Sequence, residues 1–441
     1  MSSVLGIELP NHWPAIPLKH VTSLVNRGTA PEYVDDGPVR MVSQAANQLT
    51  GMDWGRCRFH NFTGNVQSLK GYLLPGDILV NSTGTGTLGR VGYFTGSPDN
   101  RPCAADGHVT VVRTVEDLDS KFLFYWLGSA PFSEYIYTAL IVGATNQIEL
   151  NRERLRDAKI PVPSLEEQRR IADFLDAETS RIDRILVLRQ RSIAVLGDRI
   201  TAVIDSLVRG QRYAQRVPTD FLPLGEVPEP WVVARLRSLR CQVQTGPFGS
   251  QLHAEDYVAN GWPVVNPANI TPQGIVADTS VTVSDEVRAR LTRHILEDGD
   301  VVFGRRGELG RAAVVTSEQA GWICGTGSLR VRLNSGEFHP GYLMRYLGIP
   351  ALRHYFLEQS VGSTMANLNS SILLGMPLLL PDFAEQEEIS RECDSVERAI
   401  RYQIELIEKQ SSLLAERRQA LITAAVTGQF DISTASGRNT T

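Results

Sequence analysis

The chain carries the same sequence pattern twice, and this duplication constrains its fold more than any other feature. The clearest anchors lie 218 residues apart: Pro10 and Pro228, Trp13 and Trp231, Pro163 and Pro381, Glu167 and Glu385, Gln168 and Gln386. Between these anchors the offset drifts to 223 residues at the Gly-Asp pairs 76–77 and 299–300, as insertions and deletions produce. Solenoid repeats are about 20–50 residues long, so this period is too long for a solenoid. The sequence therefore predicts two copies of a whole unit, each a domain followed by a helix.

The first part of each copy has the pattern of a mixed α+β domain. It is rich in glycine and proline, and it contains short β-type runs separated by a few helical stretches. The expected strands include 77–80, 91–94, 109–113, 300–303 and 329–333, and the expected helices include 121–127 and 342–347. We assign residues 1–162 and 213–380 to these two domains. The predicted fold class is therefore α+β, built as a tandem duplication.

The second part of each copy is predicted to be one long helix. A capping residue is followed three positions later by a glutamate, and a glycine suited to a C-terminal cap ends the segment. These residues are Ser164, Glu167 and Gly210 in the first copy, and Asp382, Glu385 and Gly428 in the second. We assign residues 163–212 and 381–431 to the helices, each roughly 65 Å long at about 1.5 Å per residue. Residues 432–441 contain almost no hydrophobic side chains and are expected to be a disordered tail.

Apolar residues repeat every seven positions along both helices, which is typical of a coiled coil. The main stripe comprises Ile182, Leu186, Leu196, Ile200, Val203 and Leu207, then Ile400, Ile407, Leu414 and Leu421; beside it run Leu188, Val195, Ala202, Leu406, Leu413 and Ala420. We expect the two helices to pair antiparallel as a spacer, because tandem copies are most simply related by a pseudo-twofold axis. The alternative is that each helix packs back on its own domain.

The composition indicates a globular protein with no overall basic charge. Its 441 residues include 44 Lys+Arg and 49 Asp+Glu, so any binding of nucleic acid must come from local patches. Five cysteines without a CxxC motif argue against a zinc ribbon or a disulfide framework. The N-terminus does not resemble a signal peptide, and the longest apolar run is far below the ~18–20 residues that cross a membrane. We therefore expect a cytoplasmic protein without a membrane partner.

No motif in the sequence predicts catalysis. Residues 84–89 match GxGxxG, but a strand-like sequence follows where a dinucleotide site needs a helix, and Arg305 replaces the first glycine in the second copy. We interpret this segment as a glycine-rich β-turn. The eight histidines form no HExxH or HxxxH pair that could hold a metal. The chain is not expected to be an enzyme; the alternative is a hydrolase or nucleotide-binding domain without a recognisable motif.

The best candidates for DNA contact are two glycine-rich turns at equivalent positions. The candidate residues are Arg305, Arg306 and Arg311 in the second turn, and Thr85, Thr87 and Arg90 in the first. Guanidinium groups suit phosphate and the O6/N7 edge of guanine, whereas the first turn carries mainly small hydroxyls. Unlike chemistry at equivalent positions is what two different target sequences require. The alternative is that both are solvated hairpin turns whose arginines serve solubility.

A second pair of candidate segments lies just before the long helices. The candidate residues are Asn146 and Gln147 in the first copy, and Asn367 and Asn369 in the second. Side-chain amides can pair with the edge of adenine. They also commonly bond their own backbone in turns, so a structural role is the alternative.

The repeated layout resembles the specificity (S) subunit of type I restriction–modification enzymes, in which a variable domain precedes a long helix. The motif residues are Pro163-Ser-Leu-Glu-Glu-Gln168 and Pro381-Asp-Phe-Ala-Glu-Gln386, which open the two helices. The helix ends at 204–211 and 422–429 are similar to that family, as is the opening tryptophan followed by a leucine five residues on. The resemblance spans nearly the whole chain.

The resemblance implies a DNA-recognition protein without a catalytic centre. Each domain would bind one half of a bipartite site in double-stranded DNA, and the helices would set the spacing between the halves. The implied partners are two modification subunits, which are methyltransferases, and up to two ATP-dependent restriction subunits. No cofactor is implied for this chain, because S-adenosylmethionine, ATP and Mg would be bound by the partner subunits. The alternative is a duplicated coiled-coil adaptor that binds other proteins and no DNA.

Overall fold

The computed structural model describes residues 3–48, 51–84, 86–143, 148–221, 223–271, 274–307, 309–333, 336–360 and 367–430. Three candidate contact residues, Thr85, Asn146 and Gln147, lie outside these residues, as does the expected tail. The chain divides into two compact units. Unit 1 comprises Met1–Arg191 together with Ile407–Thr441, and unit 2 comprises Ser192–Leu406.

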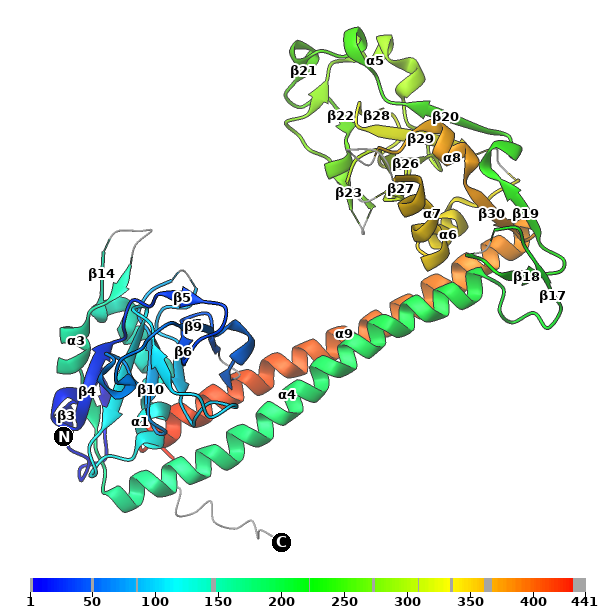
Figure 1. Cartoon of the computed structure of the whole chain (residues 1–441). Helices are drawn as coiled ribbons and strands as arrows, with labels where there is room; N and C mark the ends of the chain where they lie inside the picture. The colour runs from blue at the N-terminus through cyan, green and yellow to red at the C-terminus, as the bar shows by residue number, and fades with distance from the viewer. Residues whose placement is uncertain are drawn as a thin grey trace. The chain divides into compact units, whose positions relative to one another are not determined.

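Unit 1 is built on two four-stranded sheets (Figure 1). The first sheet has the order β11-β10-β13-β4, and all of its pairs are antiparallel. The second has the order β12-β6-β9-β5, in which β12 and β6 are parallel. The strands are β4 (Thr22–Arg27), β5 (Tyr33–Val34), β6 (Val39–Val42), β9 (Arg58–His60), β10 (Ile78–Asn81), β11 (Val91–Tyr93), β12 (Cys103–Ala105) and β13 (Val109–Thr114).

Unit 2 repeats this topology strand for strand. Its sheets have the orders β27-β26-β29-β20 and β28-β22-β25-β21, and β28 and β22 again form a parallel pair. The strands are β20 (Cys241–Thr245), β21 (Tyr257–Val258), β22 (Trp262–Val265), β25 (Thr282–Val283), β26 (Val301–Gly304), β27 (Ala312–Val314), β28 (Ile323–Cys324) and β29 (Ser328–Leu333). The predicted α+β fold class and its duplicated layout are confirmed.

Short helices close the hydrophobic core beside the first sheet of each unit. Trp126 of α1 in unit 1 and Tyr346 of α6 in unit 2 are fully buried there. The short helices are α1 (Ser120–Leu127), α2 (Ala130–Tyr135), α3 (Arg152–Asp157), α5 (Asp285–Arg290), α6 (Pro340–Leu347), α7 (Pro350–Ser360) and α8 (Ser370–Gly375).

Two-stranded pairs complete the units: β1 (Ser3–Val4) with β2 (Ile7–Glu8), β3 (Ala15–Pro17) with β16 (Lys159–Pro161), β7 (Asn47–Gln48) with β8 (Gly51–Met52), β14 (Ile141–Val142) with β15 (Glu149–Leu150), β17 (Arg216–Pro218) with β18 (Glu226–Pro228), β19 (Val232–Arg235) with β30 (Pro377–Leu380), and β23 (Ile270–Thr271) with β24 (Gly274–Ile275).

The two long helices begin directly after the predicted caps. They have 44 residues each: α4 (Leu165–Val208) and α9 (Phe383–Val426). Ser164 Oγ accepts a hydrogen bond from the Glu167 N–H at 3.3 Å, and Asp382 Oδ1 accepts one from the Glu385 N–H at 2.8 Å. Both contacts satisfy an amide that the helix itself leaves unpaired. Neither these helices nor any other helix among the described residues has the length and apolar character needed to cross a membrane.

A buried glutamine in the first turn ties each long helix to the domain before it. The amide of Gln168 donates to the carbonyl of the proline five residues earlier at 2.8 Å and accepts from the Asp119 N–H at 2.7 Å. Gln386 repeats these contacts at 3.0 Å, with its own preceding proline, and at 2.8 Å, with the His339 N–H. The last residue of the Pro-x-x-x-Glu-Gln motif therefore pairs backbone groups that would otherwise be buried without a partner.

Segments of α4 and α9 lie side by side and antiparallel within each unit (Figure 1). In unit 1, Arg418 of α9 binds Asp183 of α4 at 2.9 Å, and Arg189 donates to Gln410 at 3.1 Å. The pairing is antiparallel because the residue number rises along one helix as it falls along the other. All ten residues of the main predicted stripe are buried or half-buried. The adjacent stripe instead faces solvent at Leu188, Val195, Ala202, Leu406, Leu413 and Ala420.

The C-terminal end of each long helix packs on the domain of the other copy, which the sequence analysis did not predict. In unit 1, α9 is followed by Gly428 with φ +72°, where a Cβ atom would lie 2.4 Å from Pro10 Cγ and 3.3 Å from the Trp13 ring. In unit 2, Gly210 has φ +57°, and a Cβ atom there would lie 2.5 Å from Pro228 Cγ. The repeated proline and glycine therefore serve one close contact in each unit.

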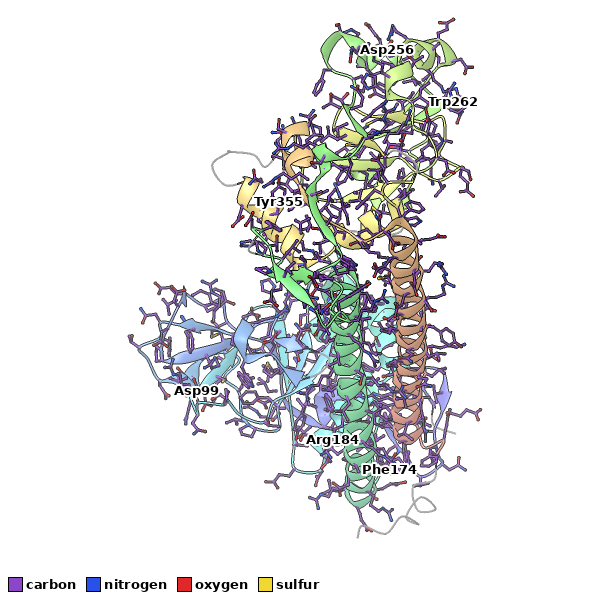
Figure 2. All side chains as sticks on the ribbon, turned by 90° about the vertical axis from the view of Figure 1, so that its right-hand side faces the viewer. Asp99, Phe174, Arg184, Asp256, Trp262 and Tyr355 are labelled. Atoms are coloured by element: carbon purple, nitrogen blue, oxygen red, sulfur yellow. The ribbon has the colours of Figure 1, made fainter. Side chains whose placement is uncertain are left out.

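The beginning of each long helix packs on the domain that precedes it. In unit 1, Ile171 and Leu175 of α4 are buried in the domain core. Phe174, labelled in Figure 2, stacks on Phe430 with 5.6 Å between the ring centroids. In unit 2, Ile389 of α9 is buried in the same way. The alternative of packing on the helix's own domain thus holds for the helix beginnings, and the helix pairing holds for the remainder.

Candidate nucleic-acid interface

The two glycine-rich turns connect equivalent pairs of antiparallel strands. Gly84 and residues 86–89 lie between β10 and β11, and the described residues of the counterpart lie between β26 and β27. The turns also share a backbone contact: the Ser82 N–H donates to the His108 carbonyl at 2.8 Å, and the Arg305 N–H donates to the Gly327 carbonyl at 2.9 Å. The described part of the GxGxxG segment, Gly84 and residues 86–89, is a turn followed by strand β11, as the sequence analysis expected. The shared contact aligns Ser82 with Arg305 and therefore Gly84 with Gly307, so the expectation that Arg305 replaces the first glycine is wrong.

A buried aspartate–arginine pair supports each of these hairpins. Asp77, just before β10, accepts two hydrogen bonds from Arg113 of β13, both at 2.7 Å. Asp300, just before β26, accepts two from Arg332 of β29, both at 2.8 Å. Hydrogen bonding to the aspartate raises the pKa of each guanidinium. The Gly-Asp pair that repeats in the sequence is therefore part of the support beneath the turn.

The structure brings the two candidate segments of unit 2 together. Arg305 Nε donates to the Leu368 carbonyl at 3.3 Å, and the Leu368 N–H donates to the Arg305 carbonyl at 2.8 Å. Unit 1 has the second of these contacts as well, because the Leu150 N–H donates to the Ser82 carbonyl at 2.8 Å. In both units the turn and the segment before the long helix therefore form one surface.

The arginines of the unit 2 turn differ in how they are held. The guanidinium of Arg305 lies 4.9 Å from the ring centroid of Phe248, and burial, together with neighbouring Arg306, lowers its pKa. Arg306 is exposed, and Arg311 is half-buried. Among the described residues, no carboxylate lies within salt-bridge distance of any of these three arginines. The turn therefore presents positive charge that the described part of the chain does not neutralise.

The two asparagines of unit 2 have different environments. Asn369 accepts a hydrogen bond from the Ile372 N–H at 3.0 Å and so caps α8, as Asn151 caps α3 in unit 1 with the Arg154 N–H at 3.0 Å. This is the structural role that turn and cap residues often have. Asn367 is exposed beside Leu368. A contact of either asparagine with DNA stays a prediction.

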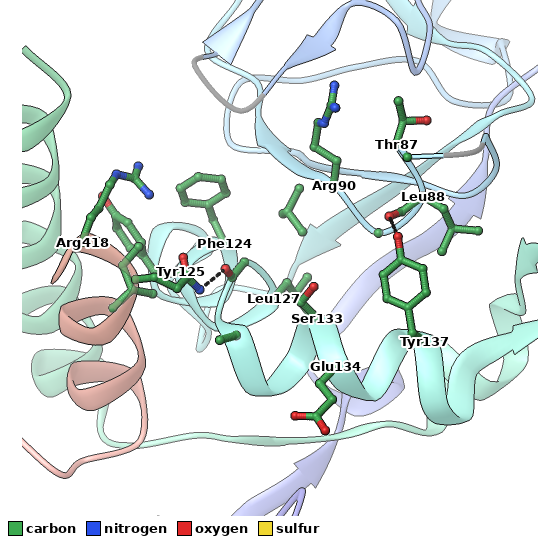
Figure 3. Close-up of a pocket in the computed structure, with 17 residues that line it drawn as sticks. Thr87, Leu88, Arg90, Phe124, Tyr125, Leu127, Ser133, Glu134, Tyr137 and Arg418 are labelled. Carbon is green, nitrogen blue, oxygen red and sulfur yellow. Dashed lines mark hydrogen bonds between the residues drawn. The ribbon is translucent and has the colours of Figure 1, made fainter. Parts of the chain in front are cut away.

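Thr87 and Arg90 line a pocket of about 630 Å³ in unit 1, between the turn, α1, α2 and the end of α9 (Figure 3). The Thr87 hydroxyl donates to the Thr83 carbonyl at 3.2 Å. Arg90 donates to Gln48 Oε1 at 2.8 Å and to the Asn47 carbonyl at 3.2 Å. Both side chains therefore stabilise the hairpin, and their contact with DNA stays a prediction.

Sequence analysis missed a polar cluster beside the unit 1 turn. The Thr83 hydroxyl lies 3.0 Å from Gln44 Oε1 and 2.8 Å from His108 Nδ1. Gly84 has φ +97°, and a Cβ atom there would lie 2.7 Å from Gln44 Oε1, so the first glycine of GxGxxG makes room for this cluster. The three residues come from separate loops, and no spacing in the sequence could have joined them.

The structure also adds an exposed aromatic residue to the unit 2 surface. The Phe248 side chain is 46% exposed and lies against Arg305. It follows β20 in the segment Gly246-Pro-Phe-Gly249, and a phenylalanine between glycine and proline residues is a signal that sequence analysis could have used. The equivalent residue of unit 1 is Ala30, so the two surfaces differ here too.

The known proteins to which this chain is similar are described as parts of type I restriction–modification systems. Residues 38–186 match the family described as type I restriction modification DNA specificity domain. A putative type I restriction enzyme MjaX specificity subunit from Methanocaldococcus jannaschii is 20% identical over 436 residues, which cover 97% of this chain and 96% of the relative. The type I restriction enzyme EcoBI specificity subunit from Escherichia coli is 20% identical over 393 residues, covering 81% and 80%.

Two solved structures share the fold. A chain from work on complex assembly and conformational transition of the type I R-M system has a TM-score of 0.72 at 18% identity, covering 96% of this chain and 100% of that one. The HsdS subunit from Thermoanaerobacter tengcongensis has a TM-score of 0.52 at 18% identity, covering 96% and 98%. At this identity the structures establish the shared fold, which extends over nearly the full length of each chain.

Proposed function

We propose that this chain, whose resemblance to the specificity subunits of type I restriction–modification enzymes is confirmed, recognises a bipartite DNA sequence for such an enzyme. The observation that carries the proposal is the repeated turn, supported by the same Asp–Arg pair in both units but bearing different side chains. A turn that has the same support in both units but carries different side chains is suited to recognising two different half-sites. Each unit then binds one half of the target.

The chemistry of the turns suits this role. Contacts to phosphate position a protein on the duplex, whereas hydrogen bonds to base edges in the grooves determine the sequence that is read. Arg305, Arg306 and Arg311 are suited to both, because guanidinium groups bind phosphate and the O6/N7 edge of guanine. Because the net charge is −5, we expect the isolated chain to bind DNA weakly, and its contacts with phosphate make this binding sensitive to salt. We expect tighter binding when partner subunits share the DNA.

The adaptor alternative, in which the chain binds proteins and no DNA, is not favoured by the comparisons. The two functions differ in one simple measurement, which is the retention of the chain or its complex on duplex DNA at increasing salt. A DNA-recognition subunit loses retention steeply as salt rises, because binding releases counterions from phosphates. An adaptor shows no retention at any salt concentration.

We further propose that the chain has no catalytic centre and holds no cofactor. Methyl transfer would then belong to two modification subunits that bind S-adenosylmethionine, and ATP and Mg would belong to restriction subunits, of which up to two join. The absence of HExxH, Walker and GxSxG motifs supports this division of labour. Because its substrate is chromosomal DNA, the complex would act in the cytoplasm. Binding of S-adenosylmethionine or ATP by the isolated chain would contradict the proposal.

Co-expression with the cognate modification subunit tests the function directly. N6-methyladenine is then mapped across the host DNA. The expected result is one new bipartite motif, with two short specific stretches separated by a fixed gap. If an intact, purified complex adds no methylation and is not retained on duplex DNA, the proposed function is wrong.

The long helices are proposed to set the gap between the half-sites. Inserting about one helical turn into one of the two helices should change the length of the gap and leave both half-sites as they were. The measurement is again the methylation motif of the complex. An unchanged gap in a variant that still methylates would show that the helices do not set the spacing.

A further inference from the structure

The two units place different hydrogen-bonding groups at equivalent positions of the candidate interface. The loop after β6 aligns with the loop after β22, because the Ala46 N–H donates to the Ser43 carbonyl at 3.0 Å and the Asn269 N–H donates to the Asn266 carbonyl at 2.9 Å. With the shared turn contacts, this alignment pairs Gln44 with Pro267, Thr83 with Arg306, and His108 with Gly327. The polar cluster of unit 1 therefore has no counterpart in unit 2, where an arginine stands instead.

In unit 1, Thr83 couples Gln44 to His108. A hydroxyl has a single proton, so Thr83 donates one hydrogen bond and accepts the other. When it donates to Gln44 Oε1, at 3.0 Å, His108 Nδ1 must carry a proton and donate to Thr83, at 2.8 Å. The atoms left over are then the Gln44 amide nitrogen, a donor, and His108 Nε2, an acceptor in the neutral ring. Among the described residues, neither of these two atoms has another hydrogen-bond partner.

Reversing the direction of both hydrogen bonds also leaves one free donor and one free acceptor. If the Gln44 amide nitrogen donates to Thr83, the hydroxyl donates to His108 Nδ1 and Nε2 carries the proton. The free atoms are then the Gln44 oxygen, an acceptor, and His108 Nε2, a donor. With a neutral imidazole, the relay therefore always leaves one donor and one acceptor for a ligand.

In unit 2 the position equivalent to Thr83 carries an arginine, Arg306, whose side chain has donors only. Arg306 is exposed, and a guanidinium has five N–H donors and no acceptor. Arg305 stands beside it, with Nε bonded to the Leu368 carbonyl and its guanidinium against the Phe248 ring. These contacts hold the Arg305 side chain in place, whereas the guanidinium group of Arg306 is accessible.

We propose that the Gln44–Thr83–His108 relay of unit 1 reads an adenine and that Arg306 of unit 2 reads a guanine. In the major groove adenine presents an acceptor, N7, beside a donor, the N6 amino group, whereas guanine presents two acceptors, N7 and O6. The relay matches adenine, because guanine would place an acceptor against an acceptor. Arg306 matches guanine, because the N6 amino group of adenine would face another donor. This inference rests on the proposed function and assigns a base class to each unit.

Substitutions in the co-expressed complex test the assignment. Thr83→Val removes the relay hydroxyl and Thr83→Ser retains it, while Arg306→Ala removes the fork. Thr83→Val should relax one adenine position in one half-site, and Arg306→Ala should relax one guanine position in the other. Discrimination at each position should fall from about 5–150-fold towards equality, which is the usual range for a bidentate base contact. Thr83→Ser should retain the wild-type motif, as should His20→Ala and Arg237→Ala, which alter exposed residues away from both turns.

Base analogues separate base contacts from phosphate contacts. Binding by the purified complex is measured on duplexes with 7-deazaadenine or 7-deazaguanine at the position that each variant relaxes. Each analogue should weaken the wild-type complex and leave unaffected the variant that has lost the corresponding contact. If Arg306 binds phosphate instead, Arg306→Ala weakens binding to all duplexes alike. It then also lowers the slope of log K against log salt by about 1, as the loss of one phosphate contact predicts.

The outcomes distinguish this inference from the function on which it rests. A wild-type complex with a bipartite motif, together with variants that change neither half-site or change the same half-site, would overturn the base assignment alone. Uniform weakening without a change of motif would also overturn it. A wild-type complex that neither methylates nor binds duplex DNA would overturn both the assignment and the proposed function.

Discussion

The two units share the scaffold under the candidate interface but differ in the groups on its surface. Both have the same two sheets, the same Asp–Arg pair below the turn and the same buried glutamine at the start of a long helix. Unit 1 places an amide, a hydroxyl and an imidazole beside its turn, where unit 2 has arginines and an exposed phenylalanine. The comparison shows that the contacts which hold the turn in place were kept in both copies, while the accessible side chains diverged.

The largest expected effect is the loss of stability when the aspartate of an Asp–Arg pair is removed, and this loss should differ between the two units. Asp77→Ala should destabilise unit 1 by about 3–5 kcal/mol, because it leaves a half-buried Arg113 without its carboxylate. Asp300→Ala should cost about 1 kcal/mol less, because Arg332 keeps a second, exposed partner, Glu297, at 2.5 Å. Hydrogen exchange of the β10 and β26 amides at increasing urea measures each unit separately.

One exposed aspartate in each unit provides the control for this comparison. Asp35→Ala in unit 1 and Asp298→Ala in unit 2 should leave both exchange profiles unchanged. Equal losses for Asp77→Ala and Asp300→Ala would show that Glu297 does not compensate, and the proposed difference between the units would then be wrong.

The buried glutamines should show where the units are alike. Gln168→Leu and Gln386→Leu each leave a buried backbone N–H and a carbonyl unpaired, which costs about 1–3 kcal/mol for each such group. We expect similar losses in the two units, measured as faster exchange at the starts of α1 and α6. Gln→Glu at the same sites buries a carboxylate with one oxygen against the proline carbonyl, so it should cost at least as much. A loss confined to one unit would break the symmetry inferred here.

The two N-cap residues should contribute slightly different amounts to stability. Asp382→Ala should cost about 1–2 kcal/mol and Ser164→Ala about 0.5–1 kcal/mol, because the aspartate adds a negative charge at the positive end of the helix dipole. Its hydrogen bond to the Glu385 N–H is also shorter, at 2.8 Å against 3.3 Å. Exchange of the first-turn amides of α9 and α4 measures both. Ser164→Asp should raise the protection of α4, and no change there would contradict the dipole argument.

The smallest expected effect is a response to acid in unit 2 alone. Burial lowers the pKa of His294, and the charges of Arg330 and Arg293 lower it further, whereas the equivalent position in unit 1 is Gly71. Unfolded histidine titrates near pH 6.5, so below that pH the unfolded state binds a proton that the folded unit resists. This contribution to stability is therefore complete above about pH 6.5 and declines as the pH falls.

A histidine variant isolates this response from other groups that titrate in acid. Between pH 7.5 and 5.5, unit 2 of the wild type should lose more stability than unit 2 of His294→Gln, by less than about 1 kcal/mol. The urea midpoints of the β26 amides measure the difference. Identical pH profiles for the two proteins would show that His294 does not contribute.

Local patterns explain how much of the fold could be predicted. The N-caps at Ser164 and Asp382 act on amides three residues away. The turn that follows β10 has closely spaced glycines with positive φ, Gly84, Gly86 and Gly89. The sequence alone was therefore enough for both. The sevenfold apolar repeat likewise identified the paired face of the long helices. The same repeat also marked the adjacent stripe at Leu188 and Leu413, which is exposed, because both stripes have the same period and only packing decides which is covered.

The candidate interface was only partly predictable for the same reason. The turn arginines and Asn367 could be named from their residue types and from the repeat. The relay of Gln44, Thr83 and His108 could not, because its members are separated by 39 and 25 residues and meet only through the order of the strands.

The sequence by itself determined the duplication, the fold class, the starts of the long helices and the position of the glycine-rich turns. Each of these depends on residues close together in the chain or on the repeat. Tertiary structure alone decided that Gly428 packs on Pro10 and that Gly210 packs on Pro228, so that each helix ends on the other copy's domain. It also decided which polar groups meet beside the turn. Such contacts join residues far apart in the chain, and their free energy depends on how whole sheets and helices pack rather than on any local pattern.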